Sequence, residues 1–159
     1  MNVKLCLLGE KGYAFLRGMA SSGAHRKHRI IVEVGRDKDV KYDFSPEIIA
    51  LAKECGADCM ERSSSQDVSK FDKIFAVGWR WMIGGVSERK LIVVHDSLLP
   101  KYRGFAPLVN ALMNREPRVG VTALYGSHDY DCGDIILQKV VPVDYPIRIS
   151  EAISLVSSL

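Results

Sequence analysis

The stretch that decides the fold is LIVVHDSLLPKYRG, residues 91–104. It opens with four apolar residues, three of them β-branched, and such a run predicts a short buried strand. At His95 the run gives way to a polar loop that contains proline and glycine. In open α/β sheets, ligands bind at the carboxyl ends of the strands. We therefore expect His95 to lie beside a ligand site, with a structural histidine that bonds a loop carbonyl as the alternative.

On both sides of this stretch the sequence alternates apolar runs with amphipathic segments. The runs predict strands, and the segments predict helices at 13–21, 46–55, 106–113 and 149–159; the further strands fall at 3–8, 28–34, 57–60, 71–77, 119–125 and 134–141. This alternation predicts a doubly wound, mainly parallel α/β sheet of Rossmann-like type with helices on both faces. The short loop before 134–141 predicts an antiparallel edge strand.

Residues 1–159 suit one domain, and the final helix stops without a cap, so we expect a further C-terminal part. Ser45 precedes Pro46 and is expected to be the N-cap of its helix. The segment GEKG, residues 9–12, follows the first strand but lacks the G-x-G-x-x-G spacing of dinucleotide-binding turns. A tight strand-to-helix turn and a nucleotide contact both remain open for it.

The composition is that of an ordinary globular protein, with 47% hydrophobic and 26% charged residues and a formal charge of +3. A charge this small argues against a nucleic-acid-binding protein, which usually has a concentrated basic face. The main basic cluster is HRKHR, residues 25–29. We interpret it as the turn into the second strand, with an anion or RNA contact as the alternative. Residues 62–66 are polar and predict a loop.

No stretch has the length and apolar character of a membrane span, and the first residues do not resemble a signal peptide. The pair in CGADC, Cys55 and Cys59, has no second Cys/His pair at zinc-like spacing, so we expect no metal site. Reduced cysteines in a cytoplasmic protein are the better interpretation of the four cysteines. We expect no membrane partner.

Both tryptophans lie in GWRWMIGG, residues 78–85, directly after a predicted strand. Two large aromatic side chains beside glycines can form the wall of a site for a planar ring. The alternative is that one tryptophan belongs to the core and the other packs on a neighbouring helix.

HDSLLPKYRGFAPL, residues 95–108, together with GVTALY and DYDCGDII further on, resembles the formyltransferases that use 10-formyltetrahydrofolate. The family pattern is Asn-x-His-x-Ser-Leu-Leu-Pro-x-x-Arg-Gly with a later Asp-x-Gly. This chain matches it at the histidine, the Ser-Leu-Leu-Pro and Arg-Gly segments and the Asp-x-Gly, which are His95, Ser97, Leu98, Leu99, Pro100, Arg103, Gly104, Asp131 and Gly133. The resemblance is strong from about residue 75 to 141 and implies a folate-dependent formyl transfer on the same type of sheet.

The resemblance implies roles for particular residues. His95 stabilises the oxyanion or moves a proton, and a carboxylate at Asp131 would favour its charged form and orient it. The formyl donor, 10-formyltetrahydrofolate, would contact the tryptophan loop and a glycine further on, and the amine substrate would contact the histidine loop. The expected folate contacts are Trp79, Arg80, Trp81, Met82 and Gly126, and the expected substrate contacts are Ser97, Lys101, Arg103 and Gly104. Lys101 and Arg103 can meet a phosphate or form salt bridges within the loop.

One position departs from the family pattern. The asparagine two residues before the histidine is Val93 here, and valine cannot donate a hydrogen bond to the oxyanion. Loss of one such donor typically costs ~10²–10³ in rate. Ser97 and Asn110 are candidates to replace it. The open hypotheses are an active formyltransferase and a weak or inactive folate-binding homologue.

The accepted amine is the least determined feature. The compact motif is similar to that of the amino-sugar formyltransferases, so a nucleotide-linked amino sugar is the leading small-molecule substrate. A methionyl-tRNA formyltransferase-like enzyme is the alternative. The basic loop of those enzymes is not found in this sequence, and truncation could have removed their additional C-terminal domain. We therefore expect a nucleic-acid partner less than a small molecule.

Overall fold

The computed structural model describes residues 1–40, 42–62 and 67–159. Four residues of the polar loop expected at 62–66, residues 63–66, lie outside this description. The described residues form a sheet of seven strands with the order β3-β2-β1-β4-β5-β6-β7. The strands are β1 (Asn2–Leu7), β2 (Arg29–Val34), β3 (Asp58–Glu61), β4 (Lys73–Val77), β5 (Leu91–His95), β6 (Arg118–Tyr125) and β7 (Ile135–Pro142).

Strands β1 to β5 pair in parallel, whereas β6 is antiparallel to β5 and β7 is antiparallel to β6. The predicted mainly parallel sheet with an antiparallel edge is therefore confirmed. Because β1 lies between β2 and β4, the strand order reverses there, and the carboxyl ends of β1 and β4 meet at the switch point where α/β proteins bind ligands.

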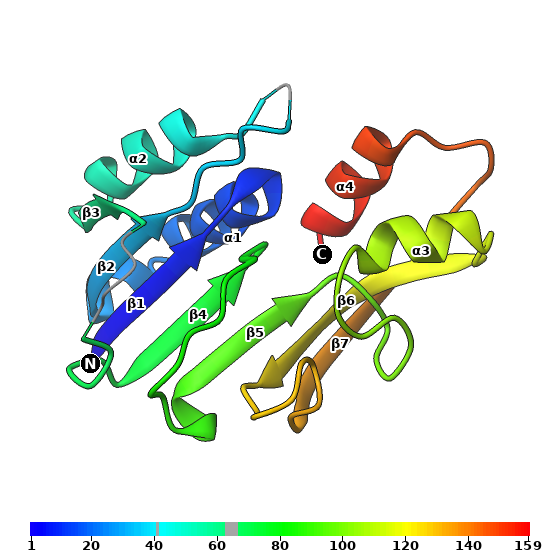
Figure 1. Ribbon diagram of the computed structural model, residues 1–159. Coiled ribbons are helices and arrows are strands. Elements are labelled where there is room, and N and C mark those ends of the chain that lie inside the picture. The colour runs from blue at the N-terminus through cyan, green and yellow to red at the C-terminus, as the bar shows by residue number, and fades with distance from the viewer. Residues whose placement is uncertain (41, 63–66) are drawn as a thin grey trace.

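The structure has the α-helices α1 (Gly9–Ser21), α2 (Ser45–Glu54), α3 (Pro107–Met113) and α4 (Ile149–Ser157), with the short 3₁₀ helices η1 (Ala24–Lys27) and η2 (Glu88–Lys90). Helix α1 contacts α2 and α4, and α3 contacts α4, so these four helices share one face of the sheet (Figure 1). We expected α-helices on both faces. The described connections from β3 to β4 and from β4 to β5 contain no α-helix, and loops cover the opposite face instead.

The larger core lies between the sheet and helices α1 and α2. Its side chains alternate along β1 and β2 and include Leu5, Leu7, Val32, Leu16 and Ile48, each 0% exposed. The intervening residues point to the opposite face, because successive side chains of a strand alternate.

On that opposite face, Lys4 and Glu33 form a buried ion pair of 2.7 Å. Phe71 and Ile74 bury the adjacent surface together with residues of the 79–91 segment. The sheet thus has a helix-covered face and a loop-covered face.

Two element boundaries differ from the expected ones. Helix α1 begins at Gly9, so GEKG forms its first turn instead of a turn before it. Gly12 allows this close start, because a Cβ there would lie 3.0 Å from Cβ of Leu7. Helix α2 begins at Ser45 after Phe44, whose φ is 56°. The N-cap is therefore not Ser45; the carboxylate of Asp43 accepts its backbone N–H at 3.1 Å.

Candidate active site

His95 is the last residue of β5 and lies opposite Thr122 of β6. It is 7% exposed, on the loop-covered face of the sheet. Its Nε2 lies 2.7 Å from the carbonyl oxygen of Tyr102, and its Nδ1 lies 3.4 Å from Oδ2 of Asp131. A carbonyl oxygen can only accept, so Nε2 carries a proton. The Asp131 carboxylate faces Nδ1 of His95 and thereby orients the imidazole ring.

Asp131 reaches His95 from the loop between β6 and β7. Its Oδ2 also accepts the backbone N–H of Gly104 at 2.9 Å, which joins this loop to the one after β5. The backbone is left-handed at Tyr102 (φ 58°), Gly104 (φ 83°) and Asp131 (φ 53°). Such conformations are costly for residues other than glycine and persist where the surroundings impose them. The two loops therefore hold His95 and Asp131 in a fixed relation.

Gly133, the glycine of Asp-x-Gly, allows the loop of Asp131 to fold back on the sheet. A Cβ at this position would lie 1.9 Å from the carbonyl oxygen of Tyr125, which no side chain tolerates. Gly126 has a similar packing role, because a Cβ there would lie 2.7 Å from Leu91. Gly126 lies beside the first residue of β5, at the end of that strand away from His95.

Hydrogen bonds from β6 and β7 also attach the loop after His95 to the sheet. The hydroxyl of Thr122, which is 0% exposed, donates to the carbonyl of Ser97 at 2.6 Å and accepts the N–H of Leu99 at 3.2 Å. The amide of Gln138 donates to the same hydroxyl and to the carbonyl of Leu99, both at 2.9 Å. The sequence reasoning missed Thr122 and Gln138. The signal that could have identified them in the sequence is a polar residue within a predicted, mostly apolar strand.

The expected substrate contacts fall into different environments. Ser97 is 3% exposed and donates its hydroxyl to the carbonyl of Lys101 at 2.7 Å, so it shapes the loop. Lys101 forms a salt bridge of 2.8 Å with Glu116. Arg103 is exposed and forms no ion pair within the described part of the chain. Gly104 contributes the N–H that binds Asp131.

Four of the five expected folate contacts, all except Gly126, gather at the carboxyl ends of β1, β2 and β4. Trp79 and Trp81 pack edge to face with ring centroids 4.9 Å apart, over Gly35, where a Cβ would lie 2.8 Å from the Trp81 ring. The guanidinium of Arg62 lies 4.3 Å from the Trp81 ring centroid. The other two expected contacts, Arg80 and Met82, are exposed, and Met82 is 61% exposed.

Two ion pairs link residues that follow the carboxyl ends of different strands. Lys11 of α1 binds Asp96, the residue after His95, and Arg80 binds Asp37. Burial and the nearby Arg80 lower the pKa of Lys11 to about 8, and the nearby Glu10 carboxylate partly opposes that shift. The sequence reasoning missed both pairs, because their members are far apart in the chain.

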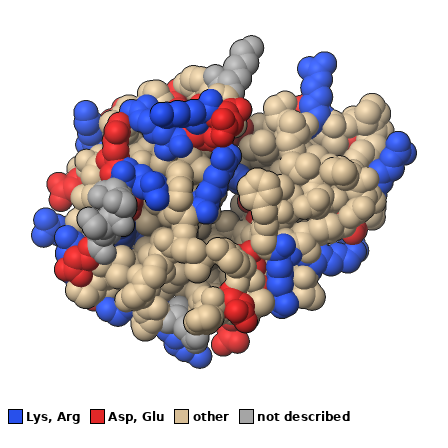
Figure 2. All heavy atoms as spheres, viewed as in Figure 1, with Lys and Arg blue, Asp and Glu red and all other residues tan. Residues whose placement is uncertain are grey.

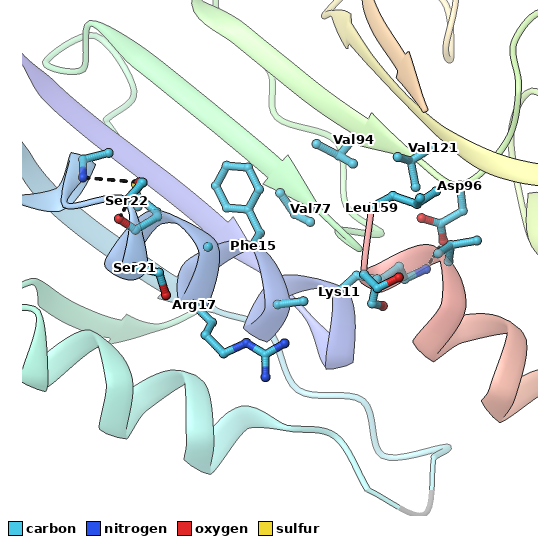
Figure 3. Close-up of a pocket in the computed structure, with 17 residues that line it drawn as sticks. Lys11, Phe15, Arg17, Ser21, Ser22, Val77, Val94, Asp96, Val121 and Leu159 are labelled. Atoms are coloured by element: carbon cyan, nitrogen blue, oxygen red, sulfur yellow. Dashed lines mark hydrogen bonds and ion pairs between the residues drawn. The ribbon is translucent and has the colours of Figure 1, made fainter. Parts of the chain in front are cut away.

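Lys11 and Asp96 meet at one end of a groove of about 620 Å³ between α1 and α4 on the helix-covered face (Figure 3). Its apolar lining includes Phe15, Val77, Val94, Val121 and Val156. Neither His95 nor Asp131 lines it, because alternate residues of β5 point to opposite faces. The groove and the His95 site are therefore separate features.

The remaining sequence signals have plain structural places. The cluster at 25–29 comprises η1 and the start of β2, which confirms the predicted turn into that strand. Figure 2 shows basic and acidic side chains mixed on this side of the molecule, with a largely uncharged area over α3 and α4.

Within residues 1–40, 42–62 and 67–159, no group of three or more His, Cys, Asp or Glu side chains is placed to hold a metal ion. No helix of that part is long and apolar enough to cross a bilayer.

Residues 67–152 match the family model described as formyl transferase, over more than half of the chain. The chain belongs to the formyl transferase family. The matched region contains His95, Asp131 and both loops that join them. Val93, where the family pattern has asparagine, lies on β5 in register with Ala76 and Leu124, on the same face as His95.

Among curated relatives, this formyl transferase chain is 30% identical over 139 residues to the methionyl-tRNA formyltransferase of Thermodesulfovibrio yellowstonii. That match includes 78% of this chain and 44% of the relative, so the chain spans less than half of that protein.

Two solved structures share the fold at lower identity. Glycinamide ribonucleotide transformylase 1 from Symbiobacterium toebii is 18% identical with a TM-score of 0.77, over 99% of this chain and 81% of that one. A sugar N-formyltransferase from a Shewanella species is 18% identical with a TM-score of 0.72, over 99% and 63%. At these identities the likeness shows the fold alone, which is that of formyltransferases.

Proposed function

We propose that the protein transfers a formyl group from 10-formyltetrahydrofolate to a primary amine, and that this amine belongs to a nucleotide-linked amino sugar. The observation that carries the proposal is the contact of His95 with Asp131, held by the Gly104 N–H within the segment that matches the family. A histidine oriented by a carboxylate can donate a proton and accept it again near neutral pH.

In the proposed reaction, the amine nitrogen attacks the formyl carbon, and the carbonyl oxygen becomes an oxyanion. The formyl oxygen takes the place of the Tyr102 carbonyl as acceptor of the Nε2–H of His95. Asp131, whose carboxylate lies 3.4 Å from Nδ1, holds the imidazole in this orientation. The intermediate then expels the folate nitrogen, which accepts a proton, and the amine loses one.

The donor would lie on the loop-covered face, between the tryptophan loop and His95. The half-buried rings of Trp79 and Trp81 offer an apolar wall at the carboxyl edge of the sheet, which suits a planar ring. Arg80 and Met82 are the exposed side chains of that loop and Gly126 is the least favoured contact, because it packs on Leu91. The residues thus fit a folate. We further propose that the enzyme is cytoplasmic, a location in which its four free thiols would stay reduced.

The decisive experiment incubates the protein with 10-formyltetrahydrofolate and a panel of nucleotide-linked amino sugars, and follows the release of tetrahydrofolate. We expect turnover with at least one amino sugar. Methionyl-tRNA belongs in the panel, because the curated relative is a methionyl-tRNA formyltransferase. Turnover with methionyl-tRNA alone would replace the sugar by that substrate.

A parallel titration with 5-formyltetrahydrofolate in a calorimeter separates binding from catalysis. Heat of binding without any turnover would favour the folate-binding homologue, in which Val93 has removed an oxyanion donor. Absence of both binding and turnover at millimolar ligand would refute the proposed function.

A further inference from the structure

The loop over His95 carries one arginine whose two chain neighbours both bond to the catalytic pair. Arg103 lies between two peptide groups that both bond to that pair: the Tyr102 carbonyl accepts from His95, and the Gly104 N–H donates to Asp131. The side chain of Arg103 is exposed and forms no ion pair in the described residues, whereas Lys101 is engaged by Glu116. An exposed guanidinium without an ion pair in the described residues is therefore carried by the loop that contacts the catalytic pair.

Two exposed aromatic residues flank the same hydrogen bond. Phe105 follows Gly104 and is 86% exposed, and Tyr130 precedes Asp131 and is 66% exposed. The backbone next to each is left-handed, at Ala106 (φ 51°) and at Asp131 (φ 53°). The rings thus stand on two constrained loops that touch at the Gly104–Asp131 bond. Exposed aromatic rings held on neighbouring loops offer faces on which a base can stack.

We propose that Arg103, Phe105 and Tyr130 recognise a nucleotide moiety of the acceptor, with its base against the aromatic rings and its phosphate on the guanidinium. Bases stack on aromatic side chains, and arginine binds phosphate oxygens through two parallel N–H groups. The inference rests on the proposed formyl transfer, since it places the nucleotide beside the reacting atoms. A sugar nucleotide and an RNA end both supply this chemistry.

The test measures nucleotide binding in the absence of folate. Uridine 5′-monophosphate and hexauridylate are titrated calorimetrically into the wild type and into Arg103→Ala, Phe105→Ala and Tyr130→Ala. Each truncation should weaken binding of both probes by about five- to a hundredfold, as expected for one stacked base or one phosphate contact. Tyr130→Phe keeps the ring and should bind within about twofold of the wild type.

Two matched controls alter exposed residues away from the site. Arg118→Ala removes an arginine at the start of β6, and Val140→Ala removes an apolar side chain, 51% exposed, from β7. Both should bind each probe as the wild type does. Melting temperatures of all variants check that the fold is kept, which is expected because every altered side chain is exposed.

The outcomes separate the two sources of the nucleotide. Similar affinities for the two probes support a sugar nucleotide, and hexauridylate binding at least tenfold more tightly supports an RNA end. Absence of saturable binding of either probe, or truncations that bind like the controls, would overturn the inference. A protein that formylates an amine but binds no nucleotide refutes this inference alone. One that binds nucleotide through these residues but never turns over folate refutes the proposed function alone.

Discussion

Val93→Asn tests whether the valine in β5 limits catalysis. Position 93 precedes His95 by two residues, so both side chains point to the same face, about 7 Å apart along the strand. Its neighbours in register are Ala76 on β4 and Leu124 on β6, and Leu124 is 1% exposed. An asparagine there restores the amide donor of the family pattern on the side where the formyl oxygen would lie.

The magnitudes follow from this environment. A single oxyanion donor is worth ~10²–10³ in turnover, and we expect the lower end, ~10²-fold, because the apolar neighbours do not help to orient the amide. Val93 is half-buried, so an amide there keeps part of its hydration, and we expect a cost of about 1 kcal/mol in the free energy of unfolding, the low end for an unsatisfied polar group. For a chain of this size, that loss lowers the melting temperature by roughly 2–4 °C.

The assay follows tetrahydrofolate release at saturating donor and amine, together with thermal unfolding of the same preparations. Ile92→Asn is the matched control: it places the same amide one residue earlier, on the helix-covered face, in register with Phe75 and Tyr125. It should lose stability without gaining turnover. Turnover of Val93→Asn within threefold of the wild type, with the expected loss of stability, would refute the reasoning.

Three further outcomes are expected. His95→Ala should lower turnover by ~10²–10⁴-fold while calorimetry shows folate affinity within a few fold of the wild type; loss of both would assign His95 a structural role. A thiol reagent at pH 8, followed by mass spectrometry, should modify exposed Cys132 but not Cys6, whose pKa burial raises to about 12; native labelling of Cys6 would contradict its burial. Lys4→Met should lower the free energy of unfolding by about 3–5 kcal/mol in denaturant titrations, because it removes an ion-pair partner of buried Glu33. Adding Glu33→Leu should recover part of this loss. An unchanged unfolding midpoint in Lys4→Met would contradict the account.

The sequence by itself determined the sheet and the place of His95. Apolar runs that end at Gly78 or His95 are local patterns, and a short buried run followed by a polar loop has few other solutions in an α/β protein. The Asp-x-Gly motif is also local, so the sequence identified Asp131 and Gly133 together. The structure explains why the second of these is glycine: its backbone lies close to the Tyr125 carbonyl oxygen. The absence of an amide at Val93 was equally visible.

The tertiary structure alone decided which distant groups meet. His95 contacts Tyr102 and Asp131 because β6 runs antiparallel to β5 and its loop folds back over that strand. Lys11 meets Asp96, and Asp37 meets Arg80, because the strand order brings separate strand ends to one edge. The side of the sheet that carries the helices depends on the handedness and length of the connections. Periodicity is a local property, whereas these contacts depend on strand order and loop path, which no short stretch of sequence encodes.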